Sequence, residues 1–261
     1  MRTLTLTLMA IVLAAAPATS APAKEICGSQ RDACVDRLIV EMQQQIERLG
    51  CAHDAPFALL YERTTEGIRD ALRAGAFSDR PLWNQVTTGF GRYYLDAAEA
   101  WRQGHGSRVP RAWRIAFTAA RDARVATLGD VLLGINAHVN RDLAYVYARF
   151  GVRNHDDHLV VNTVLARVQG AVLPELIDRY DPALPTQRSR DPELSLDIVA
   201  WRERAWRNAK RLRAAPSRAA RRRVAARIER HATAMARRIR AAFPATADEA
   251  AARDAHCGAS A

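Results

Sequence analysis

Apolar side chains recur every three or four residues through most of the chain, whereas alternating, strand-like runs are absent from the sequence outside a few short apolar stretches. The helical spacing is clear at Trp83, Val86, Phe90, Tyr94 and Trp101. A period of about 3.6 residues places such side chains on one face of an α-helix. The pattern therefore predicts an all-α protein.

Capping residues and helix breakers divide this pattern into about eight helices. Gly50, Gly75 and Gly151 end predicted helices, because glycine is favoured just after a helix C-terminus. The short links between long helices favour a single-domain antiparallel bundle over residues 24–244, followed by a flexible tail at 245–261. Five predicted helices cover residues 31–49, 56–74, 126–150, 154–180 and 216–244. Three more begin near residues 79, 110 and 191.

Residues 1–23 have the pattern of a secretory signal peptide. Arg2 supplies positive charge, an apolar run follows at residues 4–16, and small residues allow cleavage after Ser20 or Ala23. The run is shorter than the ~20 residues that a membrane-spanning helix needs. No later segment reads as apolar enough to span a bilayer. We therefore expect a periplasmic or secreted protein with no transmembrane segment in its mature chain.

Export would place the four cysteines in an oxidising compartment, where disulfides form. Cys27, Cys34, Cys51 and Cys257 allow three pairings, and the sequence does not choose among them. A bond to Cys257 would fasten the C-terminal residues to an N-terminal element. A metal site built from these cysteines is disfavoured because the sequence contains no C-x-x-C spacing.

Polar residues cluster on the predicted helix 126–150. At about 100° per residue, Asn136 and Asn140 lie about 40° apart on one face of this helix. His138 and Asp142 lie about 40° apart on a nearly opposite face. Apolar residues fill both sides between them, as is typical of a buried helix. Because an unsatisfied buried polar group costs about 1–3 kcal/mol, these side chains need partners.

The next predicted helix offers such partners. His155, His158 and Asn162 are spaced so that they share one helix face. In an antiparallel hairpin that turns near residue 152, Asp142 lies level with Asn162. We therefore expect His138, Asp142, His158 and Asn162 to converge, with His155 nearer to the end of the hairpin.

Three roles are open for this cluster. His138, Asp142 and His158 are candidate ligands of a divalent transition metal (Zn, Fe or Mn) that activates a bound water. Without a metal, Asp142 would make His138 a general base. The third role is a structural network in which buried amides tie helices together. The spacing matches no established metal motif such as H-E-x-x-H.

The segments 93–97 (YYLDA), 110–113 (PRAW), 133–143 (LGINAHVNRDL) and 161–165 (VNTVL) together resemble a bacterial helical family known as a domain of unknown function, numbered 5995. The similarity covers roughly residues 55–180, and N-A-H-[IV]-N-x-D-L is its most specific motif. The resemblance implies no particular activity. It does imply which positions are functional, namely Asn136, His138, Asn140, Asp142 and Asn162. Among these positions we expect His138 and Asp142 to be catalytic and the three asparagines to bind a cofactor.

The formal net charge of +11 arises from one segment of the chain. Residues 201–240 hold 15 basic and 2 acidic side chains, so the rest of the chain is nearly neutral. In the last predicted helix, apolar residues form a stripe and most arginines cover the opposite half. Two interpretations are open: a solvated helix face, or a patch for an anionic partner such as lipid, lipopolysaccharide or nucleic acid.

Several common catalytic motifs are absent from the sequence, namely the P-loop, G-x-G-x-x-G, G-x-S-x-G and H-E-x-x-H. Their absence disfavours nucleotide-dependent, dinucleotide-dependent and α/β-hydrolase chemistry. Two functions remain. One is an exported helical enzyme, such as a metal-dependent hydrolase, built on His138 and Asp142. The other is a non-catalytic envelope or binding protein whose polar hairpin is structural and whose basic helix meets an anionic surface.

Overall fold

The computed structural model describes residues 32–260, and the regular elements in that range are helices, apart from an isolated bridge between Val125 and Pro244. The all-α class is therefore confirmed. The predicted signal peptide at 1–23 and Cys27 lie outside the described residues. The main elements are α1 (Asp32–Leu49), α2 (Ala55–Arg73), α3 (Arg80–Arg102), α4 (Arg111–Asp122), α5 (Thr127–Ile135), the π-helical segment η2 (Asn136–Asp142), α6 (Leu143–Phe150), α7 (His155–Arg179), α8 (Ile198–Ala214), α9 (Arg218–Ala242) and α10 (Ala247–Ser260).

Local chemistry explains most of these boundaries. The Asp79 side chain accepts a hydrogen bond from the Leu82 amide and caps α3, and the Asn154 side chain caps α7. One predicted start is wrong, because α8 begins at Ile198 and not near Asp191. Asp191 instead accepts hydrogen bonds within a short turn and from Arg238, while Asp197 supplies the α8 cap.

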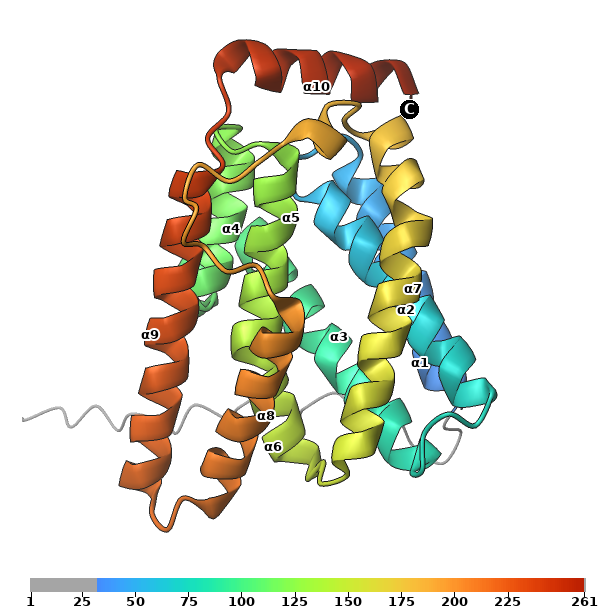
Figure 1. The fold of residues 1–261 in the computed structure, drawn as a ribbon, viewed down its shortest axis with the longest axis vertical. Coiled ribbons are helices and arrows are strands. Elements are labelled where there is room, and N and C mark those ends of the chain that lie inside the picture. Colours follow the sequence, from blue (N-terminus) through green and yellow to red (C-terminus); the bar gives the residue numbers. More distant parts are fainter. Residues whose placement is uncertain (1–31, 261) are drawn as a thin grey trace, which may run out of the picture.

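The helices form a bundle around one long central helix made of α5, η2 and α6 (Figure 1). α9 packs against α4, α5 and η2, and α8 packs against η2 and α6. α7 lies across the view from α9 and packs mainly against α2 (Figure 1). One side of the central helix therefore faces α7 across a cavity, and side chains of the candidate site lie on that side.

By length and composition, α7 could cross a membrane, which differs from the expectation of no such segment after residue 23. Only 22% of its most apolar window is buried in the protein. Five of its apolar side chains line a cavity, namely Val161, Leu165, Val172, Leu173 and Leu176. Some of the apolar side chains of α7 therefore face the inside of the protein and not its outer surface.

The C-terminal segment differs from the expected flexible tail. Residues 247–260 form α10, which crosses one end of the bundle (Figure 1). A disulfide between Cys51 and Cys257 joins α10 to the turn after α1. Arg253 adds hydrogen bonds to the carbonyls of Cys51 and Ala52. This alanine-rich segment is therefore held in place by a covalent bond and a buried arginine.

Candidate functional site

The polar motif on the central helix is a π-helix. Over Asn136–Asp142 the helix widens, and the Leu143 amide bonds the carbonyl of His138 five residues earlier. A π-helical insertion costs regular α-helical hydrogen bonding and is frequent at functional sites. Its position shows that the motif residues occupy an irregular part of an otherwise regular helix.

His138 and Asp142 form a buried pair on this segment. His138 is 2% exposed and Asp142 is 0% exposed. Nδ1 of His138 lies 3.4 Å from Oδ2 of Asp142. Because a carboxylate accepts hydrogen bonds, Nδ1 carries the proton in this arrangement and Nε2 keeps a lone pair. Burial lowers the pKa of His138 although Asp142 opposes the change, so the ring is neutral near pH 7.

Aromatic and basic neighbours hold this pair in place. The imidazole of His138 stacks on Phe90 with ring centroids 3.5 Å apart, and it meets the Tyr61 ring edge-on with centroids 4.2 Å apart. The Trp113 indole donates a hydrogen bond of 2.8 Å to Oδ2 of Asp142, and Arg141 pairs with the other carboxylate oxygen. The carboxylate is therefore fully engaged, whereas Nε2 of His138 has no hydrogen-bond partner within residues 32–260.

Asn136 and Asn140 face away from the pair, as the sequence predicts. The Asn136 side chain donates a hydrogen bond of 2.9 Å to the carbonyl of Ala232 on α9. Asn140 donates one of 3.0 Å to the side chain of Asn136. Both asparagines are buried. In this structure their contacts join the central helix to α9.

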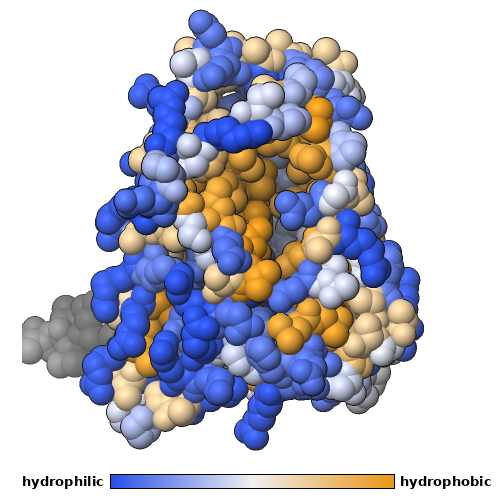
Figure 2. Space-filling model, in the orientation of Figure 1, coloured by the Kyte–Doolittle hydropathy of each residue, from blue (hydrophilic) through white to orange (hydrophobic). Residues whose placement is uncertain are grey.

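An apolar cavity of about 390 Å³ lies between the central helix, α2, α3 and α7. It opens on the face shown in Figure 2, where apolar side chains line a hollow between α7 and the connection 181–197. His138 lines this cavity, next to its stacking partner Phe90. Cavities of ~300–1,000 Å³ with few polar groups are typical of small-molecule sites. The remaining lining is mostly aliphatic or aromatic and includes Phe57, Ile68, Leu132, Ile135, Val161, Leu165, Val172 and Leu176.

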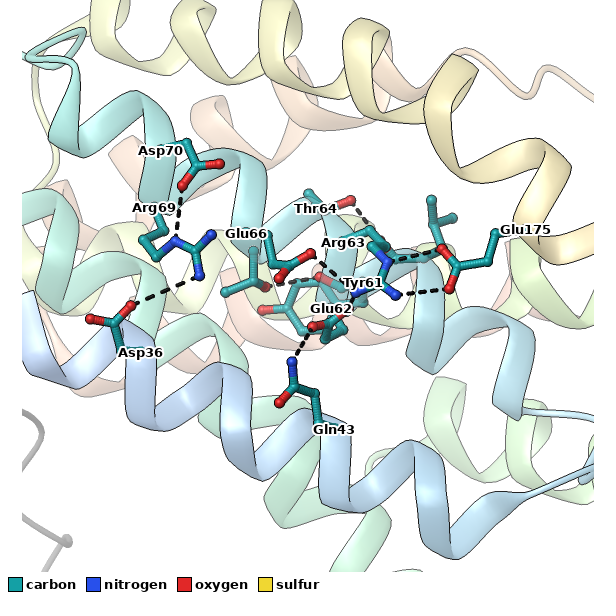
Figure 3. A network of polar contacts seen from close by, with 12 residues as sticks. Asp36, Gln43, Tyr61, Glu62, Arg63, Thr64, Glu66, Arg69, Asp70 and Glu175 are labelled. Carbon is teal, nitrogen blue, oxygen red and sulfur yellow. Dashed lines mark hydrogen bonds and ion pairs between the residues drawn. The ribbon is translucent and has the colours of Figure 1, made fainter. Parts of the chain in front are cut away.

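A polar network fixes α7, which forms one wall of the cavity, against α2 (Figure 3). Arg63 of α2 donates two hydrogen bonds to Glu175 of α7, at 2.9 and 2.8 Å. Its third nitrogen pairs with Glu62 at 2.7 Å and with Glu66 at 3.1 Å. Glu62 is fully buried and also accepts a hydrogen bond from Gln43 of α1. Burial raises the pKa of Glu62. The network links three helices outside the cavity.

His158 belongs to a second cluster at the start of α7. Its Nε2 lies 3.1 Å from Oε1 of Glu203 on α8, and Nε2 of His155 lies 2.9 Å from the same oxygen. Ligand atoms of these three residues lie within 4.8 Å of one another. Among the described residues, His155, His158 and Glu203 therefore form a cluster that could hold a metal ion. The predicted ligands His138, Asp142 and His158 are thus divided between two clusters.

Asn162 does not reach the His138–Asp142 pair either. Its side-chain oxygen accepts a hydrogen bond of 2.6 Å from Nε of Arg202 on α8. Sequence reasoning missed both α8 residues, Arg202 and Glu203, because they lie within a segment dominated by surface arginines. Arg202 lies on the helix beside Trp201 and Ala205, which are both buried. This spacing indicates a buried arginine and could have identified Arg202 from the sequence.

The arginine-rich helix α9 is amphipathic, as predicted. Ile228, Ala232, Ala236 and Ile239 are at most 1% exposed and face the bundle. Most arginines of the helix are exposed, including Arg222, Arg223, Arg227, Arg230, Arg237 and Arg240. His231, within the stripe, is half-buried and lies 2.7 Å from a nitrogen of Arg204. The apolar stripe therefore docks α9 and leaves a basic surface outward.

A family model described as "Family of unknown function (DUF5995)" matches residues 35–242. This range extends beyond the expected 55–180 on both sides and includes the arginine-rich helices α8 and α9, which lie outside the expected range. The π-helical motif and both polar clusters lie within the match. Neither a curated protein nor a solved structure matches the chain.

Proposed function

The chain belongs to the DUF5995 family, a family of unknown function, and from that premise we propose that it binds an elongated apolar molecule in the cavity beside His138. One observation carries the proposal: a cavity of about 390 Å³ with mostly apolar walls is also lined by His138, whose buried Nε2 has no hydrogen-bond partner among residues 32–260. Apolar walls favour ligand burial by the hydrophobic effect. The free lone pair of Nε2 offers one directional contact to a donor on the ligand.

A neutral fluorescent probe, N-phenyl-1-naphthylamine, tests this proposal. Its emission should rise when it enters the cavity. Leu165→Trp places a larger side chain on the cavity wall and should weaken probe binding. Leu159→Trp is the matched control, because Leu159 lies on the same helix, is 41% exposed and does not line the cavity. Equal probe affinity in both variants and in the wild type would contradict the proposal.

The His138–Asp142 pair supports a second candidate, hydrolysis of an ester in the bound molecule. Nε2 of His138 would accept a proton from water while the water oxygen attacks the ester carbonyl. The proton would then pass to the departing alcohol. Asp142 would stabilise the imidazolium, as its contact with Nδ1 suggests. Release of nitrophenol from p-nitrophenyl hexadecanoate by the wild type, and its loss in His138→Gln, is the expected result. No release by the wild type would reject this candidate.

We also propose, from the sequence pattern of residues 1–23, that the protein is exported. The Cys51–Cys257 disulfide supports an oxidising location, since such bonds are rare in reducing compartments. Fusion of residues 1–23 to a reporter that is active only after export tests this. Reporter activity is expected, and an inactive fusion that is made in normal amount would refute it.

The exposed arginines of α9 support a proposed contact with an anionic lipid surface, which suits a protein with a lipid-like ligand. Sedimentation with phosphatidylglycerol vesicles should exceed sedimentation with phosphatidylcholine vesicles and should fall as salt rises. Reversal of charge at Arg222, Arg223 and Arg227 should reduce it. Equal sedimentation with both lipids would rule out this contact.

A further inference from the structure

Arg202 on α8 carries a buried positive charge. The residue is only 3% exposed. Its Nε donates to the side-chain oxygen of Asn162 at 2.6 Å, and its Nη2 donates to the carbonyl oxygen and to Nδ1 of His158 at 2.8 and 3.2 Å. Burial and the nearby guanidinium lower the pKa of His158 to about 4, so its ring is neutral near pH 7. All three acceptors of Arg202 are therefore uncharged.

No carboxylate within residues 32–260 lies within 4.0 Å of the Arg202 guanidinium. Glu203, its acidic neighbour in sequence, directs Oε1 toward His155 and His158 instead. Buried arginines are nearly always paired, because removing an ion from water is costly without a counterion. Within residues 32–260 the Arg202 guanidinium thus has no direct counterion, and the nearby Glu203 carboxylate contacts the opposite nitrogen of His158.

The cavity reaches this charge. Arg202 is one of the cavity-lining residues, together with Tyr147 and Val161. The lining contains no acidic side chain, and its other formal charge is Arg188, which is exposed. The hydrogen bonds of Arg202 to Asn162 and His158 use Nε and Nη2, and the neutral Tyr147 hydroxyl lies beside the guanidinium, so Nη1 can still donate to a ligand.

We infer that Arg202 binds the carboxylate of a long-chain fatty acid whose apolar chain occupies the cavity. The inference rests on the proposed function, since it assumes that the cavity holds an apolar molecule. A carboxylate supplies one negative charge in direct contact with a positive charge that has no direct counterion among the described residues. The single free nitrogen also suits a monoanion better than the larger, more highly charged phosphate head. The aliphatic and aromatic walls supply the burial of the chain.

Competition with bound N-phenyl-1-naphthylamine tests the inference on the unmodified protein. The competitors are hexadecanoate, hexadecanol and hexadecyl phosphate, which share one chain and differ in the head group. Hexadecanoate should bind about tenfold or more tightly than hexadecanol, because a charge-assisted hydrogen bond is lost with the alcohol. Hexadecyl phosphate should bind more weakly than hexadecanoate.

These outcomes separate failure of the inference about Arg202 from failure of the proposed function. If hexadecanoate and hexadecanol bind equally, the role of Arg202 is overturned while the proposed apolar site stands. If hexadecyl phosphate binds most tightly, the assignment of a carboxylate is overturned. If the probe and all three competitors fail to bind, the proposed function itself is wrong, and the inference falls with it.

Variants at Arg202 locate the preference. Arg202→Gln should bind hexadecanol as the wild type does and should lose the preference for hexadecanoate. Arg202→Lys keeps the charge and should keep part of the preference, even if Arg202→Gln folds poorly. Arg207→Gln is the control, because Arg207 is exposed on the same helix. A full preference for hexadecanoate in folded Arg202→Gln would reject the inference.

Discussion

Replacing Gly134 with alanine should destabilise the protein, although alanine normally stabilises a helix interior. Gly134 lies in α5 against the ring of Phe57. A Cβ atom at this position would lie 2.3 Å from Cγ of Phe57, and 2.5 and 2.8 Å from its two Cδ atoms. These are the root atoms of a ring that is only 4% exposed. Tyr94 and Trp113 pack against the same ring, with centroids 5.2 and 5.6 Å away, so the ring cannot retreat freely.

Two opposing terms set the size of the effect. Alanine gains about 1 kcal/mol over glycine in a helix interior. Overpacking of a tight core costs about 1–3 kcal/mol. Because the contact is with the base of a confined ring, the cost should lie near the upper end of that range. We expect a net loss of about 1–2 kcal/mol, or a fall in Tm of about 2–8 °C for a chain of this size.

Thermal unfolding followed by far-ultraviolet circular dichroism measures this effect. Gly170→Ala on α7 is the matched control, because nothing lies within 4 Å of a Cβ built at Gly170. That variant should be more stable than the wild type by about 0.5–1 kcal/mol. If Gly134→Ala unfolds at or above the wild-type temperature, the packing argument for α5 and Phe57 is refuted.

Three further predictions concern other parts of the fold. The Cys51→Ser/Cys257→Ser double variant should lose about 2–5 kcal/mol in urea denaturation, because the disulfide joins residues 206 positions apart; unchanged stability would contradict this. Burial raises the pKa of Asp130 to about 7, so the native state holds a proton that the unfolded chain releases above about pH 4, and the stability from this group is lost as the pH rises toward 7. Asp130→Asn should therefore be more stable relative to the wild type at pH 8 than at pH 4.5. An equal difference in unfolding free energy at the two pH values would disprove the raised pKa of Asp130. Trp113→Phe removes the hydrogen bond to Asp142 and should cost about 1.5–3 kcal/mol in the same denaturation assay, whereas a loss under 0.5 kcal/mol would show that the bond contributes little.

Local patterns predicted the helices well because their signals lie within a few residues of each boundary. The cap at Asp79 and the glycine at 151, with φ of 73°, lie where the sequence places them. The same local logic places His138 and Asp142 together and turns Asn136 away from them. It failed at Asp191, where a contact with Arg238, 47 positions away, engages the side chain that would otherwise cap a helix.

The separation of His158 from His138 could not be predicted from helix periodicity. Matching Asp142 with Asn162 across the turn near residue 152 assumes that the two helices of the hairpin pack side by side. Here α7 packs mainly against α2, where Arg63 and Glu175 form a bidentate pair. The cavity therefore occupies the space in which the predicted cluster would have formed. Such a cavity has no signature in sequence spacing, since the same apolar residues would fill an ordinary core.

The disulfide between Cys51 and Cys257 has a topological consequence. It converts the chain between these residues into a covalently closed ring. A protease that cuts one peptide bond in the connection 181–197 would open the ring but release no fragment, so the helices on both sides of the cut would remain in one molecule. A second cut within the ring is needed before a segment can diffuse away. A nicked molecule could therefore keep its helices packed and its cavity intact.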